Sequence, residues 1–148
     1  MSSIVYFILK YSPEKIVNFS WDNALRFEGD TGPYLQYTYA RANSILEKTS
    51  KIKKFDTKNL KNDKEIRILK ILSKYPNILE RSANELKPYL LADFLYNLAV
   101  AFNEFYQTVP VLKSEDKLRI ARLKLVESVK IVLGIGLGLL SIPVLEKM

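Results

Sequence analysis

Tyrosine, arginine and lysine recur at helical spacing between residues 34 and 48. At 100° per residue, Tyr34, Tyr37, Arg41, Ser44 and Lys48 fall on one stripe of a helix, beside an apolar stripe. Tyrosine rings can stack on unpaired bases and the cations can bind phosphates, so this stripe could bind single-stranded nucleic acid. The same tyrosines could equally lie at the edge of a hydrophobic core, with only their hydroxyl groups in water.

The net charge of +7 is concentrated in one segment. Between Lys48 and Lys74 ten lysines and arginines stand against three acidic residues, and the rest of the chain is balanced. Lys51, Lys53 and Lys54 lie at the start of this segment. Such a cluster favours a polyanionic partner, nucleic acid first and an anionic membrane surface second, although a solvated loop and helix face would look the same.

The absence of cysteine and histidine excludes much chemistry. The chain has no thiol nucleophile, no imidazole base and no Cys/His zinc site. It also lacks a Walker loop and a GxGxxG motif. Glu28 and Asp30 are close in sequence, but nothing supplies a nucleophile beside them. We therefore expect no catalytic residues, no metal and no cofactor in this chain.

The apolar stretches are too short to suggest export or membrane insertion. The first residues are apolar, but they lack a basic leader and a small-residue cleavage site. Residues 131–142 form an uncharged run of twelve, whereas a membrane span needs about 20. We expect a single cytoplasmic domain with no membrane role, in which this run is the end of a core helix.

Glycine, proline and capping residues divide the chain into helices. Gly29 and Gly32 permit a tight turn over 28–32, and Pro33 suits the first turn of a helix over 33–49. Residues 2–10 are ambiguous between helix and strand.

Asn62 and Glu65 form a capping-box pattern that predicts a helix to Tyr75, ended by Pro76. The other helices are expected over 21–26 after Ser20, 78–87 after Asn77, 88–107 from Pro88, and 115 to the late 130s after Ser114. The prediction is an all-α bundle of four longer helices and one or two short ones.

Three separated stretches resemble one known family. They are FSWDNALRFEGDTGPYLQYTYAR (19–41), PYLLADFLYNLAVAFNEFYQTVPVL (88–112) and ARLKLVESVKIVLGIGLGLLSIPVLEKM (121–148). In order and content they resemble the C-terminal, DALR-type anticodon-binding domain of arginyl-tRNA synthetases.

The resemblance implies a fold and a role. The fold would be the helical bundle of class I synthetase anticodon-binding domains, with a leading segment over 1–27 and the bundle over 28–148. In this family the domain grips the anticodon stem and loop of the tRNA and does no chemistry, while a separate Rossmann domain binds ATP and arginine. The His-Ile-Gly-His and Lys-Met-Ser-Lys-Ser signatures of that catalytic domain are absent here.

The resemblance also implies a set of RNA-binding residues. Those from the family motifs are Gly29, Asp30, Thr31, Gly32, Pro33, Tyr34, Gln36, Tyr37, Arg41, Tyr106 and Met148, and we add Lys48, Lys51, Lys53 and Lys54 for phosphates. The chain departs from the family pattern at Thr38, at Tyr39 where histidine is usual, and at Ile135, Gly138 and Ser141.

Two roles follow from the sequence. The first is binding of a tRNA, specific for arginine, by a non-catalytic module. The second is a stand-alone relative that docks on a full-length synthetase, or on itself through residues 131–142.

Overall fold

The computed structural model describes residues 2–49 and 56–147, and every regular element in them is helical. The elements are α1 (Ser2–Leu9), α2 (Trp21–Ala24), α3 (Gly32–Glu47), the 3₁₀ turn η1 (Thr57–Asn59), α4 (Asp63–Leu72), α5 (Tyr75–Asn84), α6 (Pro88–Thr108) and α7 (Asp116–Leu139). The predicted all-α class is confirmed.

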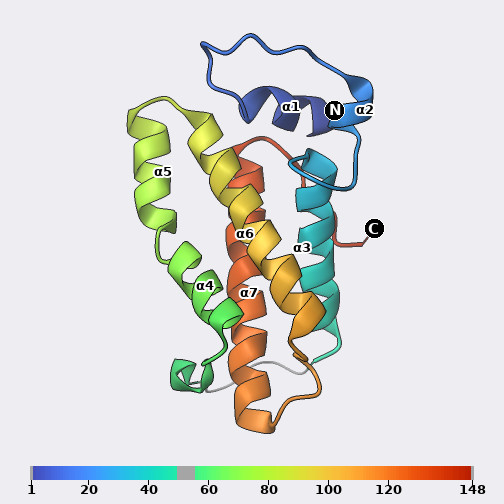
Figure 1. The fold of residues 1–148 in the computed structure, drawn as a ribbon, viewed down its shortest axis with the longest axis vertical. Coiled ribbons are helices and arrows are strands. Elements are labelled where there is room, and N and C mark those ends of the chain that lie inside the picture. The colour runs from blue at the N-terminus through green and yellow to red at the C-terminus, as the bar shows by residue number, and fades with distance from the viewer. Residues whose placement is uncertain (1, 50–55, 148) are drawn as a thin grey trace.

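Helix α7 runs through the centre of the bundle. It packs against α3, α4 and α6, and α5 packs on α6 (Figure 1). Helix α1 contacts α3 and α6 and, with α2 and the chain between them, lies across one end of the bundle (Figure 1). The core contains fully buried Leu35, Leu98, Phe102, Val126 and Leu133 from the three long helices. Burial of such side chains stabilises the fold by roughly 1.5–3 kcal/mol each.

Two helix starts match the sequence patterns. The Thr31 hydroxyl accepts a 3.3 Å hydrogen bond from the Tyr34 backbone N–H at the start of α3. At the start of α4 the Asn62 side chain accepts from the Lys64 N–H at 2.9 Å, and the Glu65 carboxylate accepts from the Asn62 N–H at 3.0 Å. The capping box is therefore present as predicted.

The sequence predicts two helices here and both are present, but the predicted boundary between them at Pro76 is wrong, as is a cap at Asn77. Helix α4 ends at Leu72, and α5 begins at Tyr75 with Pro76 in its first turn. Proline needs no N–H partner in the first turn, so Pro76 starts a helix here rather than ending one.

Two further predicted caps also fail. Ser20 precedes α2 without a side-chain hydrogen bond to it, and α2 ends at Ala24 instead of Arg26. Glu115 occupies the cap position of α7, while the Ser114 hydroxyl donates to the Pro110 carbonyl. Serine competes for nearby carbonyl groups as readily as for helix N–H groups, so sequence alone does not decide between them.

The apolar run 131–142 forms the end of α7 and the turn after it. Leu133 and Leu137 are buried, whereas Ile131, Ile135 and Leu139 are exposed. No helix within the described residues has the length and apolar character needed to cross a membrane.

Candidate nucleic-acid interface

Arg41 lies between two tyrosine rings. Its guanidinium carbon is 4.6 Å from the centroid of the Tyr37 ring and 5.1 Å from that of the Tyr106 ring. Tyr37 is 38% exposed and Tyr106 is 42% exposed. Tyr37 precedes Arg41 by one turn of α3, and the packing of α6 on α3 brings Tyr106 alongside. Three predicted site residues from two helices therefore meet, and we call Arg41, Tyr37 and Tyr106 the Arg41 site.

Asn103 fixes the direction of the Arg41 side chain. Its side-chain oxygen accepts from Arg41 Nη1 at 2.5 Å, and its amide donates to the Tyr34 hydroxyl at 3.0 Å and to Thr38 Oγ1 at 2.9 Å. Arg41 Nη2 donates to the Tyr37 hydroxyl at 2.7 Å. Asn103 is buried, so this network preorganises the arginine. Sequence reasoning missed Asn103, although a lone amide on the apolar side of an amphipathic helix was an available signal.

A hollow lies on each side of the Arg41 site. One, of about 430 Å³, is lined by Ala40, Ser44, Lys48 and Lys147 besides the site residues. The other, of about 500 Å³, is lined by Phe27, Glu28, Tyr34, Asn103 and Gln107 together with Tyr37 and Arg41. Tyr37 and Arg41 border both hollows and so form the wall between them. Hollows of this size, lined by aromatic side chains and a few polar groups, are typical of ligand-binding sites.

Three cations of this surface have no ion-pair partner within residues 2–49 and 56–147. Arg41, Lys48 and Lys147 form no ion pair with any carboxylate of the described residues. Glu28 is the acidic residue that lines the second hollow. A cation without a counter-charge, held beside exposed rings, can attract an anionic ligand.

The predicted loop Gly29–Pro33 holds α1 against the start of α3. Gly29 adopts a positive φ of 78°, and a Cβ at Gly32 would lie 3.2 Å from Tyr6 Cβ, which explains both glycines. Asp30 accepts a 2.6 Å hydrogen bond from the Tyr6 hydroxyl and pairs with Lys10 at 3.3 Å. Burial and the neighbouring Asp30 carboxylate raise the pKa of Tyr6 far above its usual value.

Several other predicted residues do not join the Arg41 site. Thr31, Gly32, Pro33 and Gln36 are buried, and the Gln36 amide donates to the Pro143 carbonyl at 2.7 Å. These contacts position helices, and binding of RNA by these residues stays a prediction. Lys51, Lys53, Lys54 and Met148 lie outside the described residues.

Tyr39 faces away from the Arg41 site. Its ring packs on α7, where a Cβ at Gly134 would be 3.0 Å from a ring carbon, and Lys130 Nζ lies 5.6 Å from the ring centroid. Lys130 also donates to the Asn43 side chain at 2.6 Å. Tyr39, at the position where the resemblance led us to expect a histidine, therefore acts in helix packing.

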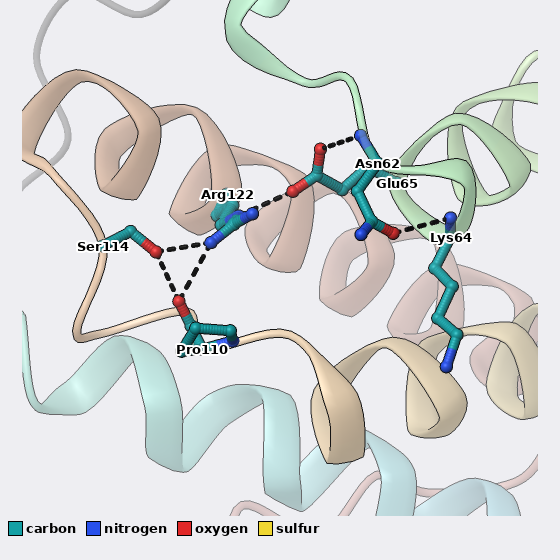
Figure 2. Close-up of polar contacts among 6 residues, drawn as sticks. All are labelled: Asn62, Lys64, Glu65, Pro110, Ser114 and Arg122. Carbon is teal, nitrogen blue, oxygen red and sulfur yellow. Dashed lines mark hydrogen bonds and ion pairs between the residues drawn. The ribbon is translucent and has the colours of Figure 1, made fainter.

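A second arginine lies in a very different setting. Arg122 Nε donates to Glu65 Oε1 at 2.6 Å, and Arg122 Nη1 donates to the Pro110 carbonyl at 3.1 Å and contacts Ser114 (Figure 2). Only 8% of Arg122 is exposed, and Glu65 is fully buried. Because the other Glu65 oxygen accepts from Asn62, the pair joins α7 to the start of α4. Sequence reasoning assigned no role to Arg122.

Comparison with known proteins identifies the chain's relatives. Residues 35–148 match the family described as the DALR anticodon binding domain. The whole chain is 42% identical over 158 residues to the arginine–tRNA ligase of Thermococcus sibiricus and 37% identical over 150 residues to that of Alkaliphilus metalliredigens. The structure superposes on Thermus thermophilus arginyl-tRNA synthetase with a TM-score of 0.94 at 36% identity, covering 99% of this chain and 26% of that one. The chain spans about a quarter of the length of the curated relatives that it matches.

Proposed function

Because the chain belongs to the DALR anticodon-binding domain family, as found in arginyl-tRNA synthetases, we propose that it binds the anticodon stem and loop of a tRNA without catalysing aminoacylation. The observation that carries the proposal is Arg41, held between two exposed tyrosines and forming no ion pair with a carboxylate of the described residues. The relatives are named as arginine–tRNA ligases, so we propose an arginine tRNA as the ligand.

The chemistry of the Arg41 site suits unstacked bases. Bases in an anticodon loop are free of pairing partners, so they can stack on tyrosine rings and on a guanidinium plane. Stacking contributes about 1–3 kcal/mol per base, and it tolerates any base because each has a π-face. The two hollows on either side of Tyr37 and Arg41 would receive neighbouring nucleotides.

Phosphate binding would come from Arg41 and from the lysines around this surface. Lys48 and Lys147 line one hollow, and the basic segment 48–74 continues from the end of α3. Phosphate contacts release counterions, so they add affinity that is independent of sequence and falls as salt rises. The cations would therefore supply general RNA affinity, and stacking at the Arg41 site would favour unpaired loop bases over paired RNA. ATP and arginine would bind elsewhere in a complete synthetase, so the chain itself would need no cofactor.

A titration with three RNAs tests the proposal. Fluorescence anisotropy would follow binding of an arginine tRNA, its isolated anticodon stem-loop and an unrelated tRNA at about 50 and about 200 mM salt. We expect the arginine tRNA and its stem-loop to bind more tightly than the unrelated tRNA at both salt concentrations. Absence of binding to all three at low salt would contradict the proposal, and equal binding would reduce the chain to a nonspecific polycation.

A pair of tyrosine variants locates the binding surface. Tyr37→Ala should weaken binding of the stem-loop by about 1–3 kcal/mol while leaving the melting temperature nearly unchanged, because the ring is exposed. Tyr39→Ala is the matched control on the same helix, and it should lower the melting temperature with little effect on RNA affinity, because its ring packs on α7. If Tyr37→Ala instead lowers the melting temperature and leaves RNA affinity unchanged, Tyr37 belongs to the core and the proposal loses its basis.

A further inference from the structure

Exposed apolar side chains gather near the beginning of the chain. Between residues 8 and 27 the large exposed ones are Ile8, Ile16, Val17, Phe19, Trp21, Leu25 and Phe27. Ile8 is 61% exposed and Trp21 58%. Single exposed apolar residues are ordinary, but a cluster of this density indicates a contact surface.

Part of this cluster forms one organised face. Ile4, Phe7, Ile8, Val17 and Phe19 line a hollow of about 250 Å³ with almost no polar atoms. The Phe19 ring meets Phe7 edge-on with centroids 5.1 Å apart, and Trp21 meets Phe19 edge-on at 4.9 Å. We call Ile4, Ile8, Val17, Phe19 and Trp21 the N-terminal face. Aromatic contacts hold its rings in place, so the face is preformed, and aromatic residues are typical of the centres of protein interfaces.

The relatives indicate what covers this face. The DALR family match begins only at residue 35, whereas the synthetase relatives match the chain throughout. Residues before 35, which include the whole N-terminal face, are therefore shared with complete synthetases but lie outside the match to the anticodon-binding module. The relatives also carry about three quarters of their length beyond the part that matches this chain.

We propose that the N-terminal face docks on the body of an arginyl-tRNA synthetase, meaning the part of the relatives that this chain does not match. A second copy of the chain fits the face less well, because each copy carries a net charge of +7 and like charges oppose association. The docking proposal rests on family membership and on this face, and does not depend on RNA binding by the Arg41 site.

The single tryptophan of the chain provides a direct probe. Trp21 lies in the N-terminal face, so chain labelled with 5-fluorotryptophan gives one ¹⁹F resonance that reports on this surface. The partner would be the Thermococcus sibiricus enzyme made without its matching quarter, with its folding checked by circular dichroism. We expect the resonance to shift or broaden with this body and to stay unchanged with the intact enzyme, whose own copy already occupies the position.

Two aspartate variants show which surface is responsible. Ile8→Asp places a charge in the N-terminal face and should weaken docking about tenfold or more. Ile135→Asp is the matched control on α7, where the side chain is 51% exposed, and it should change docking less than about twofold. Both variants should bind the anticodon stem-loop of the arginine tRNA as tightly as the unchanged chain does. A loss of docking can therefore be distinguished from a loss of RNA binding.

Three results would overturn the docking proposal. The first is a resonance that stays unchanged when the folded body is added, and the second is an equal response to the intact enzyme. The third is a shift that depends on the concentration of the chain alone, because that shift would identify a second copy as the occupant. If the shortened enzyme does not fold, a chimera provides the test, with this chain replacing the matching quarter of the intact enzyme. Ile8→Asp should then make the chimera more sensitive to limited proteolysis than Ile135→Asp does, and equal sensitivity would contradict the proposal.

Discussion

Arg122 and Arg41 are both held by several hydrogen bonds, yet their surroundings differ in one decisive respect. Arg122 is buried and faces the Glu65 carboxylate, with Pro110 and Ser114 completing its contacts (Figure 2). Arg41 is half-buried, is held by the neutral Asn103 and Tyr37, and borders two hollows.

The difference separates a structural cation from a binding cation. The charge of Arg122 is neutralised inside the protein, so its interactions are complete in the folded chain. Arg41 forms no ion pair with a carboxylate of the described residues, and the neutral amide of Asn103 fixes its position without neutralising its charge. An anionic ligand can therefore gain from Arg41 what it cannot gain from Arg122.

The largest effect is expected when the buried pair is broken. Arg122→Met should lower the free energy of unfolding by about 3–5 kcal/mol, because it leaves the Glu65 carboxylate buried without its cation. Urea denaturation followed by circular dichroism would measure this loss. RNA affinity of the fraction that stays folded should not change.

A double variant is the control for this prediction. Arg122→Met with Glu65→Gln removes both charges and keeps a side chain that can cap α4, so much of the lost stability should return. If the single variant costs less than about 1 kcal/mol, the pair does not fasten α7 to α4 and the contrast with Arg41 fails.

The contrast between the two arginines can also be tested by placing a carboxylate beside Arg41. Asn103→Asp keeps the shape of the side chain and adds a negative charge 2.5 Å from Arg41 Nη1. We expect stem-loop affinity to fall about tenfold and the salt dependence of binding to decrease by about one phosphate contact. Anisotropy titrations at several salt concentrations would measure both. Unchanged affinity would mean that RNA does not use the charge of Arg41.

A smaller effect is expected when the charge of Arg41 is kept but its shape is changed. Arg41→Lys preserves the cation, but an ammonium group cannot stack as a plane or bond Asn103 and Tyr37 in the same fork. Stem-loop affinity should fall about three- to fivefold, as for the loss of one cation–π contact of about 0.5–1 kcal/mol. Calorimetric titration with the stem-loop would measure this loss of affinity. A loss as large as that expected for Asn103→Asp would show that the geometry of the Arg41 side chain matters more than its charge.

The sequence predicted some local features of the fold and misplaced others. The start of α3 at Gly32–Pro33 and the Asn62–Glu65 capping box depend on neighbours within a few residues, and both are present. The boundary between α4 and α5 was predicted after Tyr75 instead of after Leu72, because Pro76 is compatible with either a helix end or a helix start. The ambiguous first residues became α1 because α3 and α6 supply a surface for it.

The site could be predicted only in part, because its residues meet through long-range packing. The helical period placed Tyr37 and Arg41 together on α3, and the family resemblance added Tyr106. Asn103 contacts Arg41 across 62 residues of sequence, and Arg122 contacts Glu65 across 57. No periodicity within one helix gives such pairs, so both partners became visible only in the folded chain.

The smallest effect is expected at Arg67, an arginine that is paired but exposed. It contacts the Glu104 carboxylate, and both side chains are about half exposed. Solvent screens such a pair, so Arg67→Ala should change the free energy of unfolding by less than about 0.5 kcal/mol, in contrast to Arg122→Met. The same urea denaturation measures the change, with Glu104→Gln as the matched control that removes the pair from the other helix. A loss of several kcal/mol at Arg67 would mean that pairing alone, rather than pairing with burial, makes an arginine structural in this bundle.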